Sequence, residues 1–260
     1  MVHPVPDHAE PPSPARPDPP SHRPVDGVLF DFHGTLAQVE DPVAWVRLAA
    51  EECGVSLDRG RATGLADRLV TAGRAGGPPP RRVPPHLADM YADRDLYPHC
   101  HRAAYTGLAA TVETDIDGLP EALYERLLRP EGWLPYADTA ATLRALRRAG
   151  VPVAVVSNIG FDIRPHFARW ELTGLVDAFV LSYEVGRCKP DPGIFLRACA
   201  TLGVDPARSL MVGDTPADAG AVTAGCATLV LPAANAGAAN GLGASLALLG
   251  CGEHHSRGTA

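Results

Sequence analysis

The chain has 260 residues, which is enough for one large domain or for a core with a smaller inserted domain. Its formal net charge of −7 argues against nucleic acid or an anionic membrane surface as a partner. The sequence holds no apolar run of about 18 residues, so it predicts no transmembrane helix.

The two ends of the chain are expected to lack packed structure. Residues 1–24 are rich in proline and have no apolar segment, so they do not form a signal peptide. Such a composition cannot bury enough surface to offset the entropy of ordering, and we expect a disordered arm. Residues 251–260 are expected to form a flexible tail.

The cysteines indicate the redox environment. None has C-x-x-C spacing, which is typical of reduced thiols in a cytoplasmic protein rather than of disulfides or a zinc site. They are Cys53, Cys100, Cys188, Cys199, Cys226 and Cys251.

The first predicted strand is the apolar run 28–30, which suits a buried strand of a parallel sheet. Asp31 stands where this strand ends, and open α/β sheets bind ligands at the carboxyl ends of their strands. A carboxylate there can attack an electrophile, hold a metal ion or do both. Gly34 allows a sharp turn or a close approach to a ligand, and Thr35 offers a hydroxyl to an anion. The alternative is a strand that simply ends in an Asp-containing turn.

From about 40 to 130 the hydrophobic pattern indicates helices and no strand. Asp41 and Pro42 are typical of an N-cap and a first helical position, and Gly54 ends that helix. This stretch predicts a helical insertion between one strand and the next βα unit. Further helices are expected at 59–74, 85–96, 98–112 and 120–128.

After residue 135 strands and helices alternate. This alternation predicts βαβ crossovers and a parallel sheet covered on both faces. The fold class is therefore α/β, a doubly wound parallel sheet with an inserted helical cap. The strands are expected at 151–156, 178–181, 209–212 and 227–231, and the helices at 138–149, 162–170, 193–202, 216–224 and 242–249.

Polar side chains follow most of these strands. Because the carboxyl ends of parallel strands meet at one edge of a sheet, we expect these side chains to lie close together. They are Asp31, the pair Ser157 and Asn158, Lys189, and Asp214 with Asp218 one helical turn further on.

These segments resemble the four motifs of the haloacid dehalogenase-like (HAD) hydrolase superfamily. The matching stretches are 31–35, 156–158, 182–195 and 213–221, and the resemblance covers about 27 to 232. The helical insertion is similar in position to the C1-type cap of that family. The resemblance implies a Rossmann-like core of residues 25–36 and 133–250 and a cap of residues 37–132.

The resemblance also implies a reaction. Asp31 would be the nucleophile, forming an aspartyl-phosphate with a small phosphorylated substrate. Asp31, Asp214 and Asp218, with the backbone carbonyl of His33, would hold Mg²⁺, because crowded carboxylates need a cation and hard oxygen ligands favour this ion. The phosphoryl group would be bound by Gly34, Thr35, Ser157, Asn158 and Lys189, of which Ser157 and Lys189 also serve catalysis.

His33 departs from the family pattern, which usually has a second Asp as acid/base two residues after the nucleophile. An imidazole can act as acid and base, since its unperturbed pKa lies near neutrality, but a nearby Mg²⁺ ion disfavours its protonated form. We therefore expect a slow phosphatase with His33 as a weakened acid/base, a site adapted to a good leaving group, or a histidine that only packs under the cap.

Two other functions compete with the phosphatase. Haloacid dehalogenases of this family also lack the second Asp, but they work without a metal and do not need the pair Asp214 and Asp218. That acidic pair therefore favours Mg²⁺-dependent phosphoryl chemistry. The second alternative is a catalytically weak binding or regulatory protein that keeps the fold and the metal.

The run His99-Cys100-His101 is expected on the cap surface, because three adjacent helical residues cannot face one ion.

Overall fold

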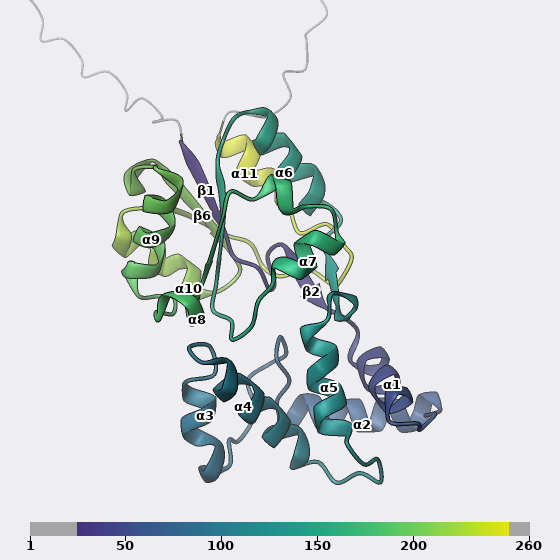
Figure 1. Ribbon diagram of the computed structural model, residues 1–260. Coiled ribbons are helices and arrows are strands. Elements are labelled where there is room, and N and C mark those ends of the chain that lie inside the picture. The colour runs from purple at the N-terminus through teal and green to yellow at the C-terminus, as the bar shows by residue number, and fades with distance from the viewer. Residues whose placement is uncertain (1–24, 250–260) are drawn as a thin grey trace, which may run out of the picture.

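The structure is a computed structural model that describes residues 25–249 (Figure 1). The expected arm at 1–24 and tail at 251–260 lie outside the described residues. None of the described helices combines the length and the hydropathy needed to cross a bilayer.

A five-stranded parallel sheet forms the centre of the core, in the order β5-β4-β1-β6-β7. In chain order, β4 and β5 extend the sheet on one side of β1, and β6 and β7 extend it on the other. The strand order therefore reverses next to β1, which is where open α/β sheets form a ligand crevice. The strands are β1 (Gly27–Phe30), β4 (Val153–Ser157), β5 (Ala178–Leu181), β6 (Ser209–Gly213) and β7 (Ala227–Val230).

Helices cover both faces of this sheet. Val28 and Phe30 of β1 pack in one hydrophobic cluster, and Leu29 packs in another, because successive side chains of a strand point to opposite faces. The first face is covered by α6 (Thr139–Arg148), α7 (Arg164–Arg169) and α11 (Gly243–Leu248). On the second lies α9 (Pro192–Leu202), near α8 (Ser182–Val185) and α10 (Pro216–Ala219) (Figure 1). The doubly wound α/β fold is confirmed.

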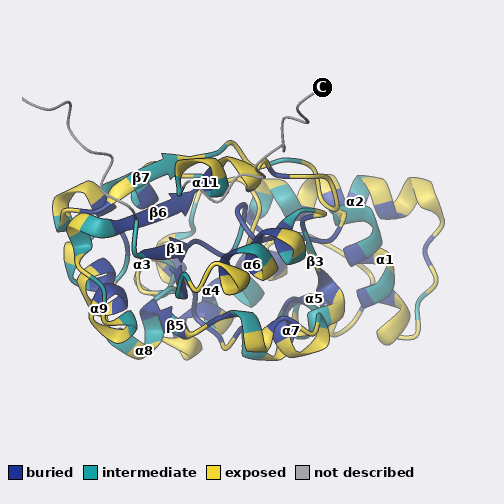
Figure 2. Cartoon of the chain, turned by 90° about the horizontal axis from the view of Figure 1, so that it is seen from above, coloured by how far each residue is buried: buried dark blue, intermediate teal, exposed yellow. Residues whose placement is uncertain are grey.

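Burial is greatest at the centre of the sheet. Every residue of β1 and β6 is buried, whereas the edge strand β7 is partly exposed, as Figure 2 shows from above. A continuous apolar run buried on both faces is typical of a central parallel strand. The sheet core is therefore a rigid support for the side chains that follow β1 and β6.

The helical insertion leaves the core through a short antiparallel pair, β2 (Ala37–Val39) and β3 (Trp133–Pro135). Its helices have a hydrophobic cluster of their own, built around Trp45, Leu69 and Leu123. The Asp41 side chain accepts hydrogen bonds from the backbone N–H groups of Val43 and Ala44, as its capping position predicts. The helices are α1 (Pro42–Glu52), α2 (Arg59–Ala72), α3 (Ala88–Ala92), α4 (Pro98–Ala110) and α5 (Leu119–Leu128).

Short 3₁₀ segments occur at several connections, and they explain two differences from the expected helices. The helix expected at 85–96 is a 3₁₀ turn followed by the short α3, and the helix expected at 216–224 changes to 3₁₀ geometry at Gly220. The expected surface position of Cys100 and His101 is wrong, since both are buried. The 3₁₀ segments are Pro85–Leu87, Pro130–Gly132, Thr173–Leu175, Pro206–Arg208 and Gly220–Ala224.

Candidate active site

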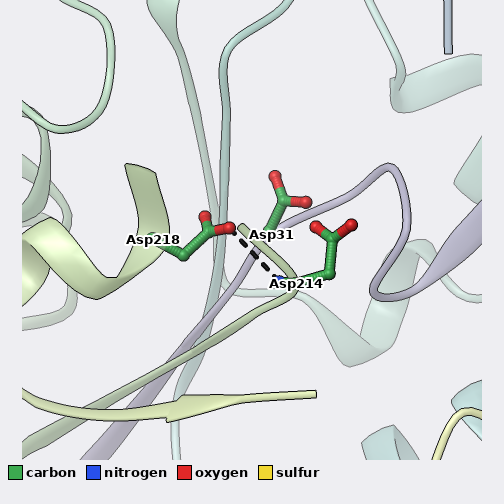
Figure 3. A group of neighbouring side chains, drawn as sticks. All are labelled: Asp31, Asp214 and Asp218. Atoms are coloured by element: carbon green, nitrogen blue, oxygen red, sulfur yellow. Dashed lines mark hydrogen bonds between the residues drawn. The ribbon is translucent and has the colours of Figure 1, made fainter. Parts of the chain in front are cut away.

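Three carboxylates from distant parts of the chain meet at the carboxyl edge of the sheet (Figure 3). Asp31 follows β1, Asp214 follows β6, and Asp218 lies in α10. One oxygen of each carboxylate lies within 4.8 Å of the others. The two strands are hydrogen-bonded neighbours, and the Asp31 N–H continues their pairing by donating to the Val212 carbonyl at 2.9 Å. The sheet therefore fixes the spacing of the first two acids.

Lys189 provides a buried positive charge at this cluster. Its Nζ lies 2.5 Å from Asp31 Oδ1 and 2.6 Å from Asp218 Oδ1. Although burial favours the neutral amine, the charges of Asp31 and Asp218 raise the pKa of Lys189. The ammonium therefore stays charged and neutralises one of the three carboxylates.

The Asn158 side chain positions Lys189. Its Oδ1 accepts from the Lys189 N–H at 2.7 Å, and its Nδ2 donates to the Lys189 carbonyl at 2.9 Å. The Asn158 side chain is thus engaged with the backbone of the lysine. Ser157, the neighbouring residue at the end of β4, is buried at the same edge of the sheet.

The two acids that follow β6 differ in their hydrogen bonds. Asp218 Oδ2 accepts from the backbone N–H groups of Asp214 and Thr215, at 3.2 and 3.0 Å, and from the Thr215 hydroxyl at 2.6 Å. Asp214 Oδ1, in contrast, is buried and has no hydrogen-bond partner in the part of the chain that the structure describes. A buried oxygen without a partner is costly, so this atom requires a donor or a cation.

The turn after Asp31 brings the backbone close to these acids. Gly34 has φ +83°, and a Cβ atom there would lie 2.2 Å from Asp214 Oδ2, so no other residue fits. The Thr35 hydroxyl lies 3.4 Å from Asp31 Oδ2. Within residues 25–249 no hydrogen bond reaches the His33 carbonyl oxygen, although the carbonyls of its neighbours Phe32 and Gly34 are both bonded.

The electrostatics of the cluster leave it with excess negative charge. Burial raises the pKa of Asp31 to about 7, against the opposing effect of Lys189. Burial and the charge of Asp218 raise the pKa of Asp214 to about 6. Burial opposes ionisation of Asp218 as well, but the Lys189 charge and its hydrogen bonds outweigh burial and lower its pKa. A divalent cation would favour the charged form of all three acids.

The His33 ring lies away from this cluster. It contacts the Trp133 ring edge-on, with centroids 5.5 Å apart, and a Cβ on Gly76 would lie 2.9 Å from its Nε2. Among the described residues it has no hydrogen bond or ion pair with the three acids, and Nε2 is buried without a partner. Burial lowers the pKa of His33 to about 4, so the imidazole is neutral at pH 7.

The cap touches the core beside this site, through residues that the sequence analysis did not identify. The Ser182 hydroxyl accepts from the Ile159 N–H at 2.9 Å and donates to the Asp95 carbonyl at 2.5 Å. A Cβ on Gly160 would lie 2.5 Å from the Arg94 carbonyl oxygen, so the cap loop packs directly on the backbone after β4. Neither contact has a local pattern in the sequence, since its partners lie far apart in the chain.

Comparison with known proteins gives one family and several similar proteins. A family model described as haloacid dehalogenase-like hydrolase matches residues 25–224. The putative pyrophosphatase PpaX of Clostridium perfringens is 34% identical over 114 residues, 40% of this chain and 52% of the relative. The D-glycero-beta-D-manno-heptose-1,7-bisphosphate 7-phosphatase of Mesorhizobium japonicum is 31% identical over 181 residues, 59% of this chain and 71% of the relative. The chain thus spans about half the length of the first relative and more of the second.

Solved structures share the fold at lower sequence identity. A dehalogenase superposes with a TM-score of 0.60 at 24% identity, covering 86% of this chain and 97% of that structure. The HAD phosphatase of Thermococcus onnurineus gives a TM-score of 0.54 at 23% identity, covering 86% and 98%. The family match extends over both the first and the last of the aspartates that meet at the sheet edge. The chain therefore belongs to the haloacid dehalogenase-like hydrolases.

Proposed function

We propose that this hydrolase is a Mg²⁺-dependent phosphatase that acts on a small phosphorylated substrate through an aspartyl-phosphate on Asp31. The observation that supports it most strongly is the charge of the site: three carboxylates within 4.8 Å of one another face one lysine. When all three acids are ionised, two negative charges are therefore left for a cation to neutralise. Relatives named as phosphatases, including the bisphosphate 7-phosphatase, support the same reaction class.

The donor set fits Mg²⁺. Asp31 and Asp214 would hold the ion with the His33 carbonyl, because Asp214 Oδ1 and that carbonyl oxygen have no hydrogen-bond partner among residues 25–249. Asp218, whose oxygens already accept several hydrogen bonds, would contribute its charge and hold Lys189. When bound, the ion shields the phosphate from the nucleophile and stabilises the charge of the transition state.

The protein groups around Asp31 support its role as nucleophile. Lys189 and Thr35 lie at its two oxygens and fix the orientation of the carboxylate. In the first step an Asp31 oxygen bonds to phosphorus while the bond from phosphorus to the leaving oxygen breaks. In the second step a water oxygen bonds to phosphorus while the bond from phosphorus to the Asp31 oxygen breaks, which restores the carboxylate and releases phosphate that carries the water's protons. Lys189, with the hydroxyls of Ser157 and Thr35, would hold the phosphoryl oxygens.

The environment of His33 points to the kind of substrate. A neutral imidazole packed against Trp133 is a poor proton donor, so the first step favours a leaving group that departs without a proton. Aryl phosphates and phosphoanhydrides have such leaving groups. This supports the site adapted to a good leaving group over a full acid/base role for His33.

We also propose that residues 37–132 act as a cap and that the protein works in the cytoplasm. The separate hydrophobic cluster of α1, α2 and α5, and the contact of Ser182 with the Asp95 carbonyl, support a cap that closes over the site. The five cysteines within the described residues are free, in agreement with a reducing environment.

Phosphate release from p-nitrophenyl phosphate tests this function. The purified protein should release phosphate with Mg²⁺ and lose that activity with EDTA. Asp31→Asn should reduce the rate by a factor of about 10³ or more, whereas Asp117→Asn, at an exposed residue of the cap, should leave it unchanged. Halide release from a 2-haloacid in EDTA would show a dehalogenase instead. The absence of both activities, with a ligand still raising the melting temperature, would show a binding protein.

A further inference from the structure

A residue near the C-terminus holds the turn that follows the nucleophile. Asn240 is buried, with 5% of its surface exposed, and its Nδ2 donates to the carbonyls of Gly34 and Thr35, both at 3.0 Å. Asn240 lies beyond residues 25–224, where the family model matches. The segment that leads into α11 thus passes beside the turn between β1 and β2 (Figure 1).

The orientation of the Asn240 amide is fixed by its other hydrogen bonds. Its Oδ1 accepts from the Ala234 N–H at 2.8 Å, so its NH₂ group must face the two carbonyls. Its backbone N–H donates to Asp138 Oδ1 at 2.9 Å, and Asp138 Oδ2 accepts from the Leu242 N–H at 2.8 Å. Asp138 therefore holds the segment that carries Asn240.

The two carbonyls belong to residues with direct contacts to the site. Gly34 lies against Asp214, and the Thr35 hydroxyl lies beside Asp31. The next carbonyl, that of Leu36, accepts from the Tyr136 N–H and the Thr139 hydroxyl, so the far side of the turn is tied as well. The His33 carbonyl stands directly before the clamped pair and has no hydrogen bond among the described residues.

We propose that Asn240, held by Asp138, is a positioning residue for the reaction. It fixes the Gly34–Thr35 turn so that the Thr35 hydroxyl and the His33 carbonyl stay aligned with Asp31 and Asp214. This inference rests on the proposed phosphatase function, in which those groups hold the phosphoryl group and the metal ion. Displacements of about 1 Å in such groups can cost about 100-fold in rate, so one buried amide can control turnover from a distance.

The experiment compares Asn240→Asp and Asn240→Ala with Asn235→Ala, a matched control at an exposed residue of the same segment. Asn240→Asp keeps the size of the side chain but replaces the donor by an oxygen that faces the two carbonyls. We measure kcat and KM for p-nitrophenyl phosphate well below each melting temperature. Mg²⁺ alone is titrated into each protein by calorimetry.

Both Asn240 variants should lower kcat by about tenfold or more with KM changed less, and weaken Mg²⁺ binding about threefold or more. The Asn235 variant should match the wild type in all three values. A purely structural Asn240 would lower the melting temperature alone, so folded variants with wild-type kcat and Mg²⁺ affinity would overturn the proposal. Equal losses in the Asn235 variant would overturn it as well.

Two further arms keep the test decisive. If the Asn240 variants do not fold, Asp138→Asn replaces them, because it removes one of the two acceptors that hold the segment. This variant should show a smaller loss of kcat and of Mg²⁺ affinity. No loss in either value would refute the proposal. If the wild type releases no phosphate, the phosphatase function fails, and the Mg²⁺ titrations alone then decide whether Asn240 positions the turn.

Discussion

Two buried groups of charged side chains within residues 25–249 are balanced differently. Directly after β2, Glu40 accepts from Arg126 Nε at 2.5 Å and from Nη2 at 2.7 Å, so its carboxylate is paired with a guanidinium. At the sheet edge, Asp31, Asp214 and Asp218 face one cation among the described residues, Lys189. The pair of Glu40 and Arg126 has matched charges and needs only a structural role. The three acids exceed the charge of Lys189, which indicates that the site binds a positively charged ligand.

Arg74 is a buried charge beside this pair, and its Nε has no hydrogen-bond partner among residues 25–249. Arg74 donates to the Glu40 carbonyl at 2.9 Å and stacks over the Trp45 ring at 4.3 Å. Burial lowers the pKa of Arg74 to about 10, which still leaves it charged at pH 7. At the sheet edge, in contrast, Asp31 and Asp214 have pKa values raised to about 7 and about 6, where protons compete with a metal ion.

The largest expected effect is the loss of activity when an acid of the sheet-edge group is replaced. Asp214→Asn should lower phosphatase activity by a factor of about 10³, equivalent to about 4 kcal/mol, because it removes the buried oxygen that we assign to Mg²⁺. The melting temperature without Mg²⁺ should not fall, since the change relieves repulsion among the acids. Steady-state kinetics and thermal unfolding check both parts. If Mg²⁺ still activates the Asp214→Asn variant, the distinction between the two groups is wrong.

The balanced pair should respond in the opposite way. Glu40→Gln leaves the Arg126 guanidinium buried without its partner charge and should lower the free energy of unfolding by about 3 kcal/mol. Mg²⁺ affinity should be unchanged. The control is Glu52→Gln, which weakens the more exposed pair with Arg129 and should cost less than about 1 kcal/mol. Urea unfolding measures both, and equal losses would contradict the distinction.

The pH dependence of Mg²⁺ stabilisation sharpens the comparison. The pKa values of Asp31 and Asp214 are raised to about 7 and about 6, so below those values protons occupy the acids and must leave before the ion binds. The rise in melting temperature caused by Mg²⁺ should therefore be larger at pH 8 than at pH 5.5, with affinity changing by roughly 100-fold, equivalent to about 2.8 kcal/mol. A rise independent of pH would place the ion elsewhere.

A buried titratable group outside both clusters gives the smallest effect. His166 is buried among Phe32, Trp133 and Trp170, and neither of its ring nitrogens has a hydrogen-bond partner among the described residues. His166→Phe should raise the free energy of unfolding by about 1 kcal/mol without changing activity. Burial lowers the pKa of His166 from 6.5 to about 4, so the unfolded chain binds a proton first as pH falls. The advantage of the variant should therefore grow from pH 6.5 to pH 4, and a constant difference would refute this origin.

Much of the core could be predicted from the sequence because its signals are local. The strands that precede Asp31, Asn158 and Asp214 are continuous apolar runs, and the sheet order then brings their ends together. The predicted site residues do meet at one edge, although their roles remain proposals. The pair β2 and β3 was missed because strands of three residues show too little alternation to detect.

The contacts that were missed all depend on distant partners. Asn240 is 206 residues from Gly34, and no local pattern marks an asparagine that will donate to two carbonyls. The Asn158 side chain pairs with the backbone of Lys189, 31 residues away. His101 is buried because its Nδ1 pairs with the Tyr124 hydroxyl at 2.8 Å, a contact between two helices of the cap. Packing between elements, which the sequence pattern does not contain, decides these positions.

Trapping of the phosphorylated enzyme tests the central claim most directly. Borohydride reduces an aspartyl-phosphate to homoserine, and mass spectrometry of the peptide that spans β1 and the following turn locates the change. We predict homoserine at position 31 alone, only when both Mg²⁺ and a phosphorylated substrate are present. Phosphate release without modification of Asp31, or modification at another residue, would contradict the account.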